Sequence, residues 1–294
     1  MKLFKTKHLK AELLLVSVAI FWGVTFLMVQ EAIENVPVFS FLFYRFGFAT
    51  ILMLILSYNR FKNISKETII SGVLLGIVLF AGYSTQTYAL VFSASTMVAF
   101  LTGLFVIFVP LISFLFLKET IKRNVIVASI VSFSGLYLLT MSGTLQFGMG
   151  EVLGSACAFF IALHLIMTGK VSKNVDIFLI VLIQFLIITL LSLVTSLSFE
   201  DVTINIPYDY AFIKAILVTT IFATVYGFLI QTYMQQHVSA SKTAVIFTIG
   251  PLCAAFYGVY IGGENLLTIQ IIGAGLIIIA TIIAEMKFKS IFKR

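Results

Sequence analysis

Apolar residues run through this chain in long stretches that short polar segments separate. A run of about twenty apolar residues has the length that an α-helix needs to cross a bilayer. These runs lack the polar-apolar alternation of a membrane β-strand. Because backbone groups in lipid must pair within the chain, we predict an all-α membrane protein. Ten transmembrane helices are expected, at residues 11–30, 38–58, 68–90, 95–117, 124–142, 151–169, 176–197, 211–235, 240–261 and 267–286.

Composition supports this class and excludes a soluble one. Apolar residues make up 61% of the 294 and charged residues 11%, and the mean hydropathy is +1.13. A soluble domain carries about a quarter charged residues. The first apolar run is too long for a signal-peptide core and lacks a cleavage site, so we expect it to be retained. Cys157 and Cys253 lie inside apolar runs, without the spacing of a metal site or disulfide framework, so no metal or cofactor is expected.

The basic residues gather on one side of the predicted membrane. If the N-terminus is cytoplasmic, all of the 19 basic residues except Arg45 and Lys214 fall in inner segments. This asymmetry follows the positive-inside rule, so we predict a multi-pass protein of the inner (plasma) membrane with both termini cytoplasmic. The basic residues that give the net charge of +7 are then expected to hold the protein against anionic lipid. The expected partners are membrane lipid and a small-molecule substrate, and nucleic acid is not one.

The second half of the chain repeats the first. "TQTYALVFSASTMVAF" (85–100) resembles "IQTYMQQHVSASKTAV" (230–245), and Trp22 and Arg45 are separated by the same interval as Ile161 and Gln184. We predict two units, residues 11–142 and 151–286, with five spans each. Five is an odd number, so the second unit begins on the other side of the membrane and the repeats are inverted. Inverted repeats are typical of secondary transporters, whose substrate site lies between the repeats near the bilayer midplane.

Several short motifs carry a family resemblance. They are "AIFWGVTF" (19–26), "YRFGFA" (44–49), "FSASTMVAFLTGLFVIFVPLISFLFLKE" (92–119), its counterpart "VSASKTAVIFTIGPLCAAFYGVYIGGE" (238–264) and "IIGAGLIIIAT" (271–281). With these motifs in this order, the chain resembles the drug/metabolite transporter superfamily. Within that superfamily it resembles the ten-helix type with two EamA domains. The resemblance implies an exporter of small metabolites such as amino acids or amines, built as a basket around a central cavity. One departure is that Pro251 does not occupy the position equivalent to Pro110, so the predicted kinks of these two spans differ between the halves.

Polar and aromatic residues inside the spans are candidates for the cavity wall, because polar groups in lipid need a partner or a wet cavity. Trp22 sits halfway along the first span. It either forms an aromatic wall or packs between helices with its N–H bonded to a neighbour. Four other candidates either touch substrate or form interhelical hydrogen bonds; they are Tyr83, Gln86, Tyr226 and Gln231. Phe100 is a further candidate for the substrate cavity. Gly72 and Gly76 have the G-x-x-x-G spacing that lets another helix approach closely.

Two ionisable residues inside spans have open roles. Arg45 either binds an anionic substrate group or has a structural role, reaching outward to pair with Glu31, Glu34 or a backbone carbonyl. The second interpretation is the more ordinary one. His164 either senses pH or relays a proton, or is neutral and bonded to a serine or carbonyl. Since no acidic residue stands at mid-bilayer, facilitated diffusion is the simpler expectation.

Other functions fit the sequence less well. Translocation of lipid-linked or nucleotide sugars is the alternative within transport, and a channel is a weaker one. An intramembrane enzyme would need a Ser/His pair, paired Asp or a metal cluster, and no D-D-x-x-D or H-E-x-x-H occurs. Transport driven by ATP would need a phosphate-binding G-x-x-x-x-G-K-[ST] loop, which is also absent from the sequence.

Overall fold

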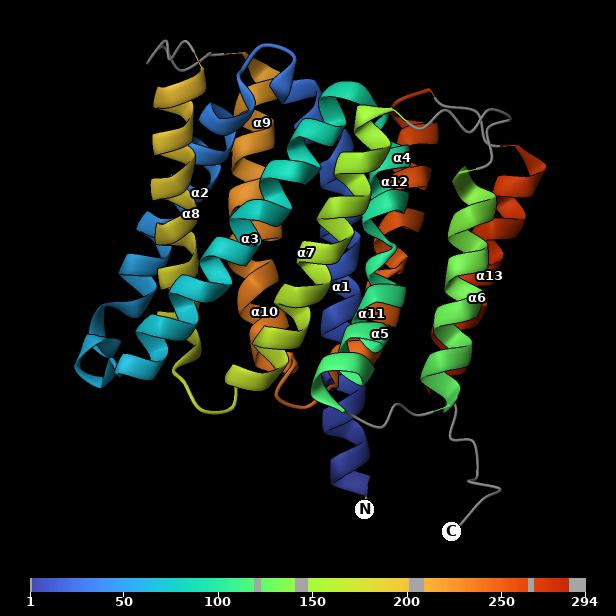
Figure 1. Ribbon diagram of the computed structural model, residues 1–294, viewed down its shortest axis with the longest axis horizontal. Coiled ribbons are helices and arrows are strands. Elements are labelled where there is room, and N and C mark those ends of the chain that lie inside the picture. The colour runs from blue at the N-terminus through green and yellow to red at the C-terminus, as the bar shows by residue number, and fades with distance from the viewer. Residues whose placement is uncertain (1, 119–122, 141–147, 201–208, 264–266, 286–294) are drawn as a thin grey trace.

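The chain folds into a bundle of helices that stand side by side (Figure 1). The computed structural model describes residues 2–118, 123–140, 148–200, 209–263 and 267–285, and within these ranges every regular element is helical. α1 begins and α13 ends at one face of the bundle, at the bottom of Figure 1. We call this the N-terminal face and the other end the opposite face.

The helices follow the predicted spans closely, with three spans divided into shorter pieces. Their bounds are α1 Lys2–Ile33, α2 Val38–Ser57, the short 3-10 helix η1 Tyr58–Asn63, α3 Lys66–Phe92, α4 Ser95–Thr102, α5 Phe105–Leu117, α6 Arg123–Thr140, α7 Met149–Val171, α8 Ile177–Phe199, α9 Tyr210–Val218, the π-helix η2 Thr219–Tyr226, α10 Gly227–Met234, α11 Ala240–Phe247, α12 Ile249–Tyr260 and α13 Thr268–Glu285.

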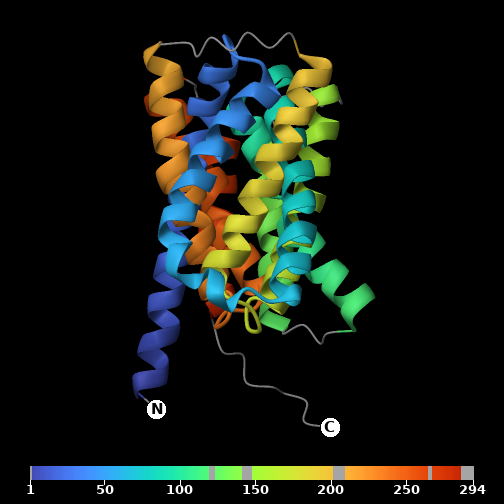
Figure 2. The same cartoon turned by 90° about the vertical axis from the view of Figure 1, so that its left-hand side faces the viewer.

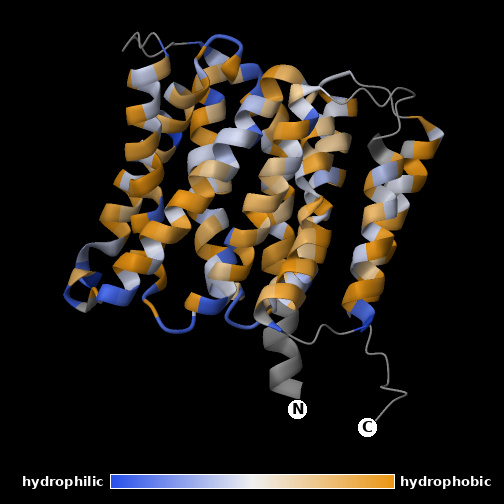
Figure 3. Cartoon of the chain, viewed as in Figure 1, coloured by the Kyte–Doolittle hydropathy of each residue, from blue (hydrophilic) through white to orange (hydrophobic). Residues whose placement is uncertain are grey.

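Length and composition fit a membrane protein. Within the described ranges, eight helical stretches are long and apolar enough to cross a bilayer, and α6 and α13 contain the shorter apolar stretches Arg123–Leu138 and Ile271–Ala280. Apolar residue types cover the body of the bundle and polar types gather at its two ends (Figure 3). Large apolar side chains such as Phe116 and Phe199 are exposed, as expected for a surface that meets lipid. The predicted all-α membrane fold is confirmed.

Two corresponding spans are broken in the same way. α4 and α11 are each eight residues long and precede breaks at Gly103–Leu104 and at Thr248. We expected Pro110 and Pro251 to set the kinks, but both breaks come earlier in the chain. Pro251 lies in the first turn of α12, where a proline's missing N–H costs no hydrogen bond.

The halves interlock through matching helix pairs. α3 packs against α7, and α9 and α10 pack against α1; α2 packs against α8, and α6 against α13. Figure 2 shows α2, α3 and α8 together on the side turned toward the viewer. α1 runs away from the N-terminal face whereas α7 runs toward it (Figure 1). The division into units at 11–142 and 151–286 stays a prediction.

Glycines allow the closest helix contacts. A Cβ added at Gly72 would lie 2.7 Å from Ile183, and one added at Gly76 would lie 2.8 Å from Ile187. The helices α3 and α8 therefore touch along this stripe. A Cβ at Gly23 would lie 2.3 Å from the Gly250 carbonyl oxygen, which places the backbones of α1 and α12 in contact. The close approach of α8 to Gly72 and Gly76 confirms the expectation that their G-x-x-x-G spacing lets a neighbouring helix approach.

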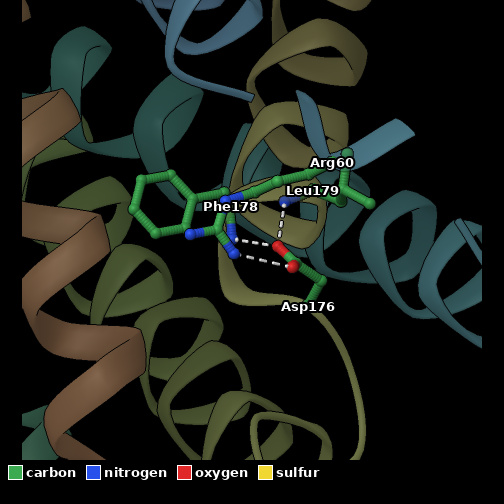
Figure 4. Close-up of polar contacts among 4 residues, drawn as sticks. All are labelled: Arg60, Asp176, Phe178 and Leu179. Carbon is green, nitrogen blue, oxygen red and sulfur yellow. Dashed lines mark hydrogen bonds and ion pairs between the residues drawn. The ribbon is translucent and has the colours of Figure 1, made fainter. Parts of the chain in front are cut away.

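Two ion pairs tie helices together at the N-terminal face. Glu12 on α1 pairs with Lys242 on α11. Arg60 Nη1 lies 2.9 Å from Asp176 Oδ2, and Asp176 Oδ1 also accepts hydrogen bonds from the Phe178 and Leu179 amides at the start of α8 (Figure 4). The Arg60 guanidinium lies 4.1 Å from the centroid of the Phe178 ring. The segment after α2 is therefore fastened to the start of α8.

The opposite face is tied by carboxylates that bind neutral donors. Glu200 at the end of α8 accepts from the Phe39 and Ser40 amides, at 2.7 and 2.9 Å, at the start of α2. Ser93 Oγ donates to Glu151 Oε1 at 2.9 Å. If Trp22 corresponds to Ile161, Glu151 is the counterpart of Glu12, and each joins its helix to the segment that opens a broken span. Glu119 and Glu264 lie outside the described residues.

Candidate solute-binding site

A cavity lies among helices from both halves of the chain, and its empty space, counted together with the part that is open to solvent, is about 780 Å³. Its walls are mainly apolar and aromatic, with a few polar side chains, as in most small-molecule sites. The lining residues are Ala19, Trp22, Thr25, Phe26, Val29, Arg45, Tyr83, Gln86, Leu90, Ala99, Thr102, Phe105, Ile161, His164, Leu165, Phe228, Gln231, Phe247, Gly250 and Pro251.

Trp22 forms part of this wall and is also bonded. Its Nε1–H donates to the Ala223 carbonyl oxygen at 2.7 Å. Its ring centroid lies 5.4 Å from that of Phe228 and 4.9 Å from that of Phe247. A Cβ at Gly227 would lie 2.8 Å from the indole nitrogen, so glycine leaves room for the ring. The two interpretations of Trp22 are therefore compatible, since one edge is bonded while the side chain lines the cavity.

Arg45 is buried, with 3% of its surface exposed. Its Nε donates to Thr224 Oγ1 at 2.9 Å and its Nη2 to the Tyr83 hydroxyl at 3.2 Å. Its guanidinium carbon lies 4.7 Å from the Tyr83 ring centroid. The expected outward pairing is wrong, because Arg45 lies on the face of α2 that packs against η2 and bonds there; within the described ranges no carboxylate pairs with it.

The π-helix η2 supplies the partners of both residues. Thr224 accepts from Arg45, Thr220 Oγ1 donates to the Arg45 carbonyl oxygen at 3.3 Å, and Ala223 accepts from Trp22. A π-helix frees carbonyls from the α-helical pattern, and such segments are frequent at functional sites. Sequence reasoning missed this element. The only signal was a cluster of threonines in the apolar stretch "TTIFATVY" (219–226).

His164 is bonded to the residue equivalent to Arg45 in the repeat. His164 Nε2 lies 2.8 Å from Gln184 Oε1, and Gln184 Nε2 donates to the Ile180 carbonyl oxygen at 3.2 Å. In this arrangement Gln184 Oε1 can only accept, so His164 Nε2 carries a proton. The contact fits a hydrogen-bonded histidine, with a side-chain amide in place of the expected serine or backbone carbonyl.

Gln231 stands between the cavity and a second, polar pocket. Its Nε2 donates to Gln235 Oε1 at 3.1 Å, and Gln235 Nε2 donates to the Leu165 carbonyl oxygen at 3.0 Å. Gln235 lines a pocket at the N-terminal face, with Lys170, Lys173 and other polar residues. The Gln231 Oε1 atom is buried and has no hydrogen-bond partner among the described residues.

Most of the candidate residues from the sequence meet at the cavity. Those that line it are Trp22, Arg45, Tyr83, Gln86, His164 and Gln231. Tyr226 instead forms a 2.7 Å hydrogen bond between its hydroxyl and Ser17 Oγ. Phe100 packs in the apolar core. In this conformation neither Tyr226 nor Phe100 lines the cavity, so its geometry does not support a direct solute contact for them.

Several apolar wall residues were not anticipated. Phe26, Phe228 and Phe247 line the cavity, and Phe228 also contacts the rings of Tyr83, His164 and Phe185. The chain has 30 phenylalanines, and their spacing gave no sign of which ones turn inward.

The charge of the cavity is one-sided. Arg45 is the one Lys or Arg among the described lining residues, and those residues include no Asp or Glu. The site thus offers a cation, several neutral donors and acceptors, and an aromatic wall, which suits an amphipathic molecule more than a free cation.

Helices long enough to span a membrane surround this cavity. The fold is therefore that of a multi-pass membrane protein with a site for small solutes. The sequence model of the EamA-like transporter family matches residues 9–141 and 148–286. The chain belongs to the EamA-like transporter family, and it is a membrane transporter, as the resemblance of its motifs implied.

Relatives agree with this assignment. An uncharacterized transporter of Archaeoglobus fulgidus is 30% identical over 286 residues, which cover 96% of this chain and 87% of the relative. The uncharacterized transporter YoaV of Bacillus subtilis is 25% identical, with 92% and 94% of the two chains covered. A solved crystal structure superimposes with a TM-score of 0.77 at 15% identity, over 94% of this chain and 96% of the other, which shows a shared fold.

Proposed function

We propose that this chain is a secondary transporter that exports small amphipathic metabolites, such as amino acids, by alternating access at the central cavity. The observation that carries the proposal is the cavity itself, whose walls come from both halves of the chain, with Trp22 from one and Phe228 from the other. Sites of this kind lie between the repeats of secondary transporters. Free amines fit less well, because the described lining residues include no carboxylate.

An inverted duplication would let such a protein expose the cavity to either side. The opposite directions of α1 and α7, the matching breaks before α5 and α12, and the matching positions of Glu12 and Glu151 support it. Two nearly equivalent halves can exchange conformations at similar energy. We propose that the N-terminal face, which carries Arg60, Lys170 and Lys173, is the cytoplasmic face of the plasma membrane.

The proposal is tested with purified protein in liposomes. Uptake is measured for a panel of labelled amino acids, amines, organic acids and nucleotide sugars, with and without a pH gradient. We expect saturable uptake of at least one amphipathic metabolite, unchanged by the gradient. Uptake that rises linearly with concentration would indicate a channel, and uptake confined to nucleotide sugars would favour sugar translocation.

A further inference from the structure

We propose that the cavity binds an elongated organic anion in one orientation. Its carboxylate meets Arg45, its apolar or aromatic body lies against Trp22 and Phe228, and an O–H or N–H group at its far end donates to Gln231. This inference rests on the proposed transport function, because it names the chemical class of the solute at that same site.

The first point of recognition is an unbalanced cation. Nε and Nη2 of Arg45 are bonded to neutral hydroxyls, and its Nη1 has no hydrogen-bond partner in the described part of the chain. A buried charge without a counter-charge is costly unless something compensates it. A guanidinium binds a carboxylate strongly and in a fixed geometry. Because Arg45 lines the cavity, a solute carboxylate can supply the missing charge there.

The second point is an unused acceptor. Gln231 is 1% exposed, and its Oε1 has no donor among the described residues although its Nε2 is bonded to Gln235. Leaving a buried acceptor unsatisfied costs more than an average hydrogen bond contributes. Gln231 lines the same cavity as Arg45, so a donor on the solute would satisfy it.

The two points lie at different depths. Arg45 is bonded to Thr224, which precedes Gln231 by seven residues on the continuous η2–α10 helix. That interval corresponds to about 10 Å along a helix axis, and the two side chains reach into part of it. A solute that binds both therefore carries its anion and its donor at opposite ends, with a body about as long as a benzene ring and a short chain.

Aromatic rings fill the wall between these points. Phe228 lies on α10 between Thr224 and Gln231, and its ring centroid is 5.4 Å from that of Trp22 and 6.2 Å from that of Tyr83. Such a wall favours a flat apolar body over a hydrated one. Together the three features predict a para-substituted aromatic carboxylate better than a sugar or a diamine.

Binding can be measured without transport, because Trp22 is the only tryptophan of the chain and lines the cavity. Its fluorescence, excited where phenols do not absorb, is titrated in purified full-length protein with four probes: 3-(4-hydroxyphenyl)propionate, its amide, 3-phenylpropionate and tyramine. We expect the hydroxylated acid to bind about tenfold or more tightly than the amide and than 3-phenylpropionate. Tyramine should bind most weakly.

Two variants separate the two points. Arg45→Gln should abolish the preference for the acid over the amide and keep the preference for the hydroxyl. Gln231→Leu should abolish the preference for the hydroxyl and keep the preference for the acid over the amide. Arg60→Gln, which removes a cation at the N-terminal face, should leave both preferences unchanged. If either cavity variant fails to fold, the four-probe ranking in the unaltered protein still decides the matter.

The two proposals fail in different ways. Equal affinity for acid and amide, or tight binding of tyramine, overturns the orientation even if the liposome panel shows transport. The expected ranking without transport of any panel solute leaves the binding inference standing and removes the transport proposal. Loss of both preferences in Arg60→Gln would mean that the probes bind at the N-terminal face, which also overturns the inference.

Discussion

Trp22 shows how a polar group can be kept inside the membrane. Its N–H is satisfied by the Ala223 carbonyl of the π-helix, and its ring contacts Phe228 and Phe247 beside the cavity. A buried indole usually needs such a partner. The polar edge and the apolar face of this one side chain therefore have different roles, and substitutions can separate them.

We expect Trp22→Phe and Trp22→Ala to differ. Trp22→Phe keeps a ring in the wall and loses one hydrogen bond, so it should lower the free energy of unfolding by about 1 kcal/mol and leave most of the transport. Trp22→Ala removes the wall, so it should reduce transport more than it lowers the yield of folded protein. Uptake in liposomes is compared with the monodisperse yield from size-exclusion chromatography. An equal loss of both in Trp22→Ala would mean that the residue only packs.

The sequence predicted the polar members of the site better than the apolar ones. A Tyr, Gln or His inside an apolar run needs a partner, so Tyr83, His164 and Gln231 were visible as candidates. Phe228 was not, because nothing in sequence distinguishes a phenylalanine in a cavity wall from one in lipid. The partners of Arg45 were also mispredicted, since they depend on the rotation of α2 and on the π-helix beside it.

At the scale of elements, glycine contacts set how closely the helices approach. Gly23 brings α1 against the Gly250 carbonyl of α12, with no space for a methyl group. Because the obstacle is backbone rather than a flexible side chain, α1 itself would have to move. Gly275 on α13 is the opposite case, since a Cβ there would meet nothing within 4 Å.

Gly23→Ala and Gly275→Ala therefore form a matched pair. Gly23→Ala should destabilise the protein by about 2 kcal/mol through overpacking and separate α1 from α12. Gly275→Ala should be neutral or slightly stabilising, because alanine has the higher helix propensity. Thermal unfolding in detergent compares the two. A Gly23→Ala protein as stable as the Gly275→Ala protein would contradict the close contact.

The helices were predictable and their interruptions were not. A run of about twenty apolar residues predicts the length of a span but says nothing of its internal geometry. We therefore predicted one helix each for residues 95–117 and 240–261. The breaks at Gly103–Leu104 and at Thr248 come from local backbone changes among equally apolar neighbours. The prolines that drew attention lie inside α5 and α12.

At the scale of the whole molecule, the proposed orientation assigns each loop to one side of the membrane. In a variant with Cys157 and Cys253 replaced by serine, a cysteine at Glu34, on the opposite face, should react with a membrane-impermeant thiol reagent added to intact cells. A cysteine at Tyr58, which is 78% exposed, should react only after lysis. Both positions are exposed, so accessibility within the fold does not decide the outcome. The reverse pattern would place the termini outside.

The ties at the two ends of the bundle differ in kind although they occupy matching positions. Glu12 holds an ammonium group, whereas Glu151 holds a hydroxyl and a backbone amide. Dissolved electrolyte weakens an attraction between opposite charges far more than it weakens a bond between a carboxylate and a neutral donor. Ionic strength is therefore expected to weaken the tie at the N-terminal face and to spare the tie at the opposite face. If the protein works by the proposed alternating access, the salt concentration at the N-terminal face would then bias which side of the cavity opens.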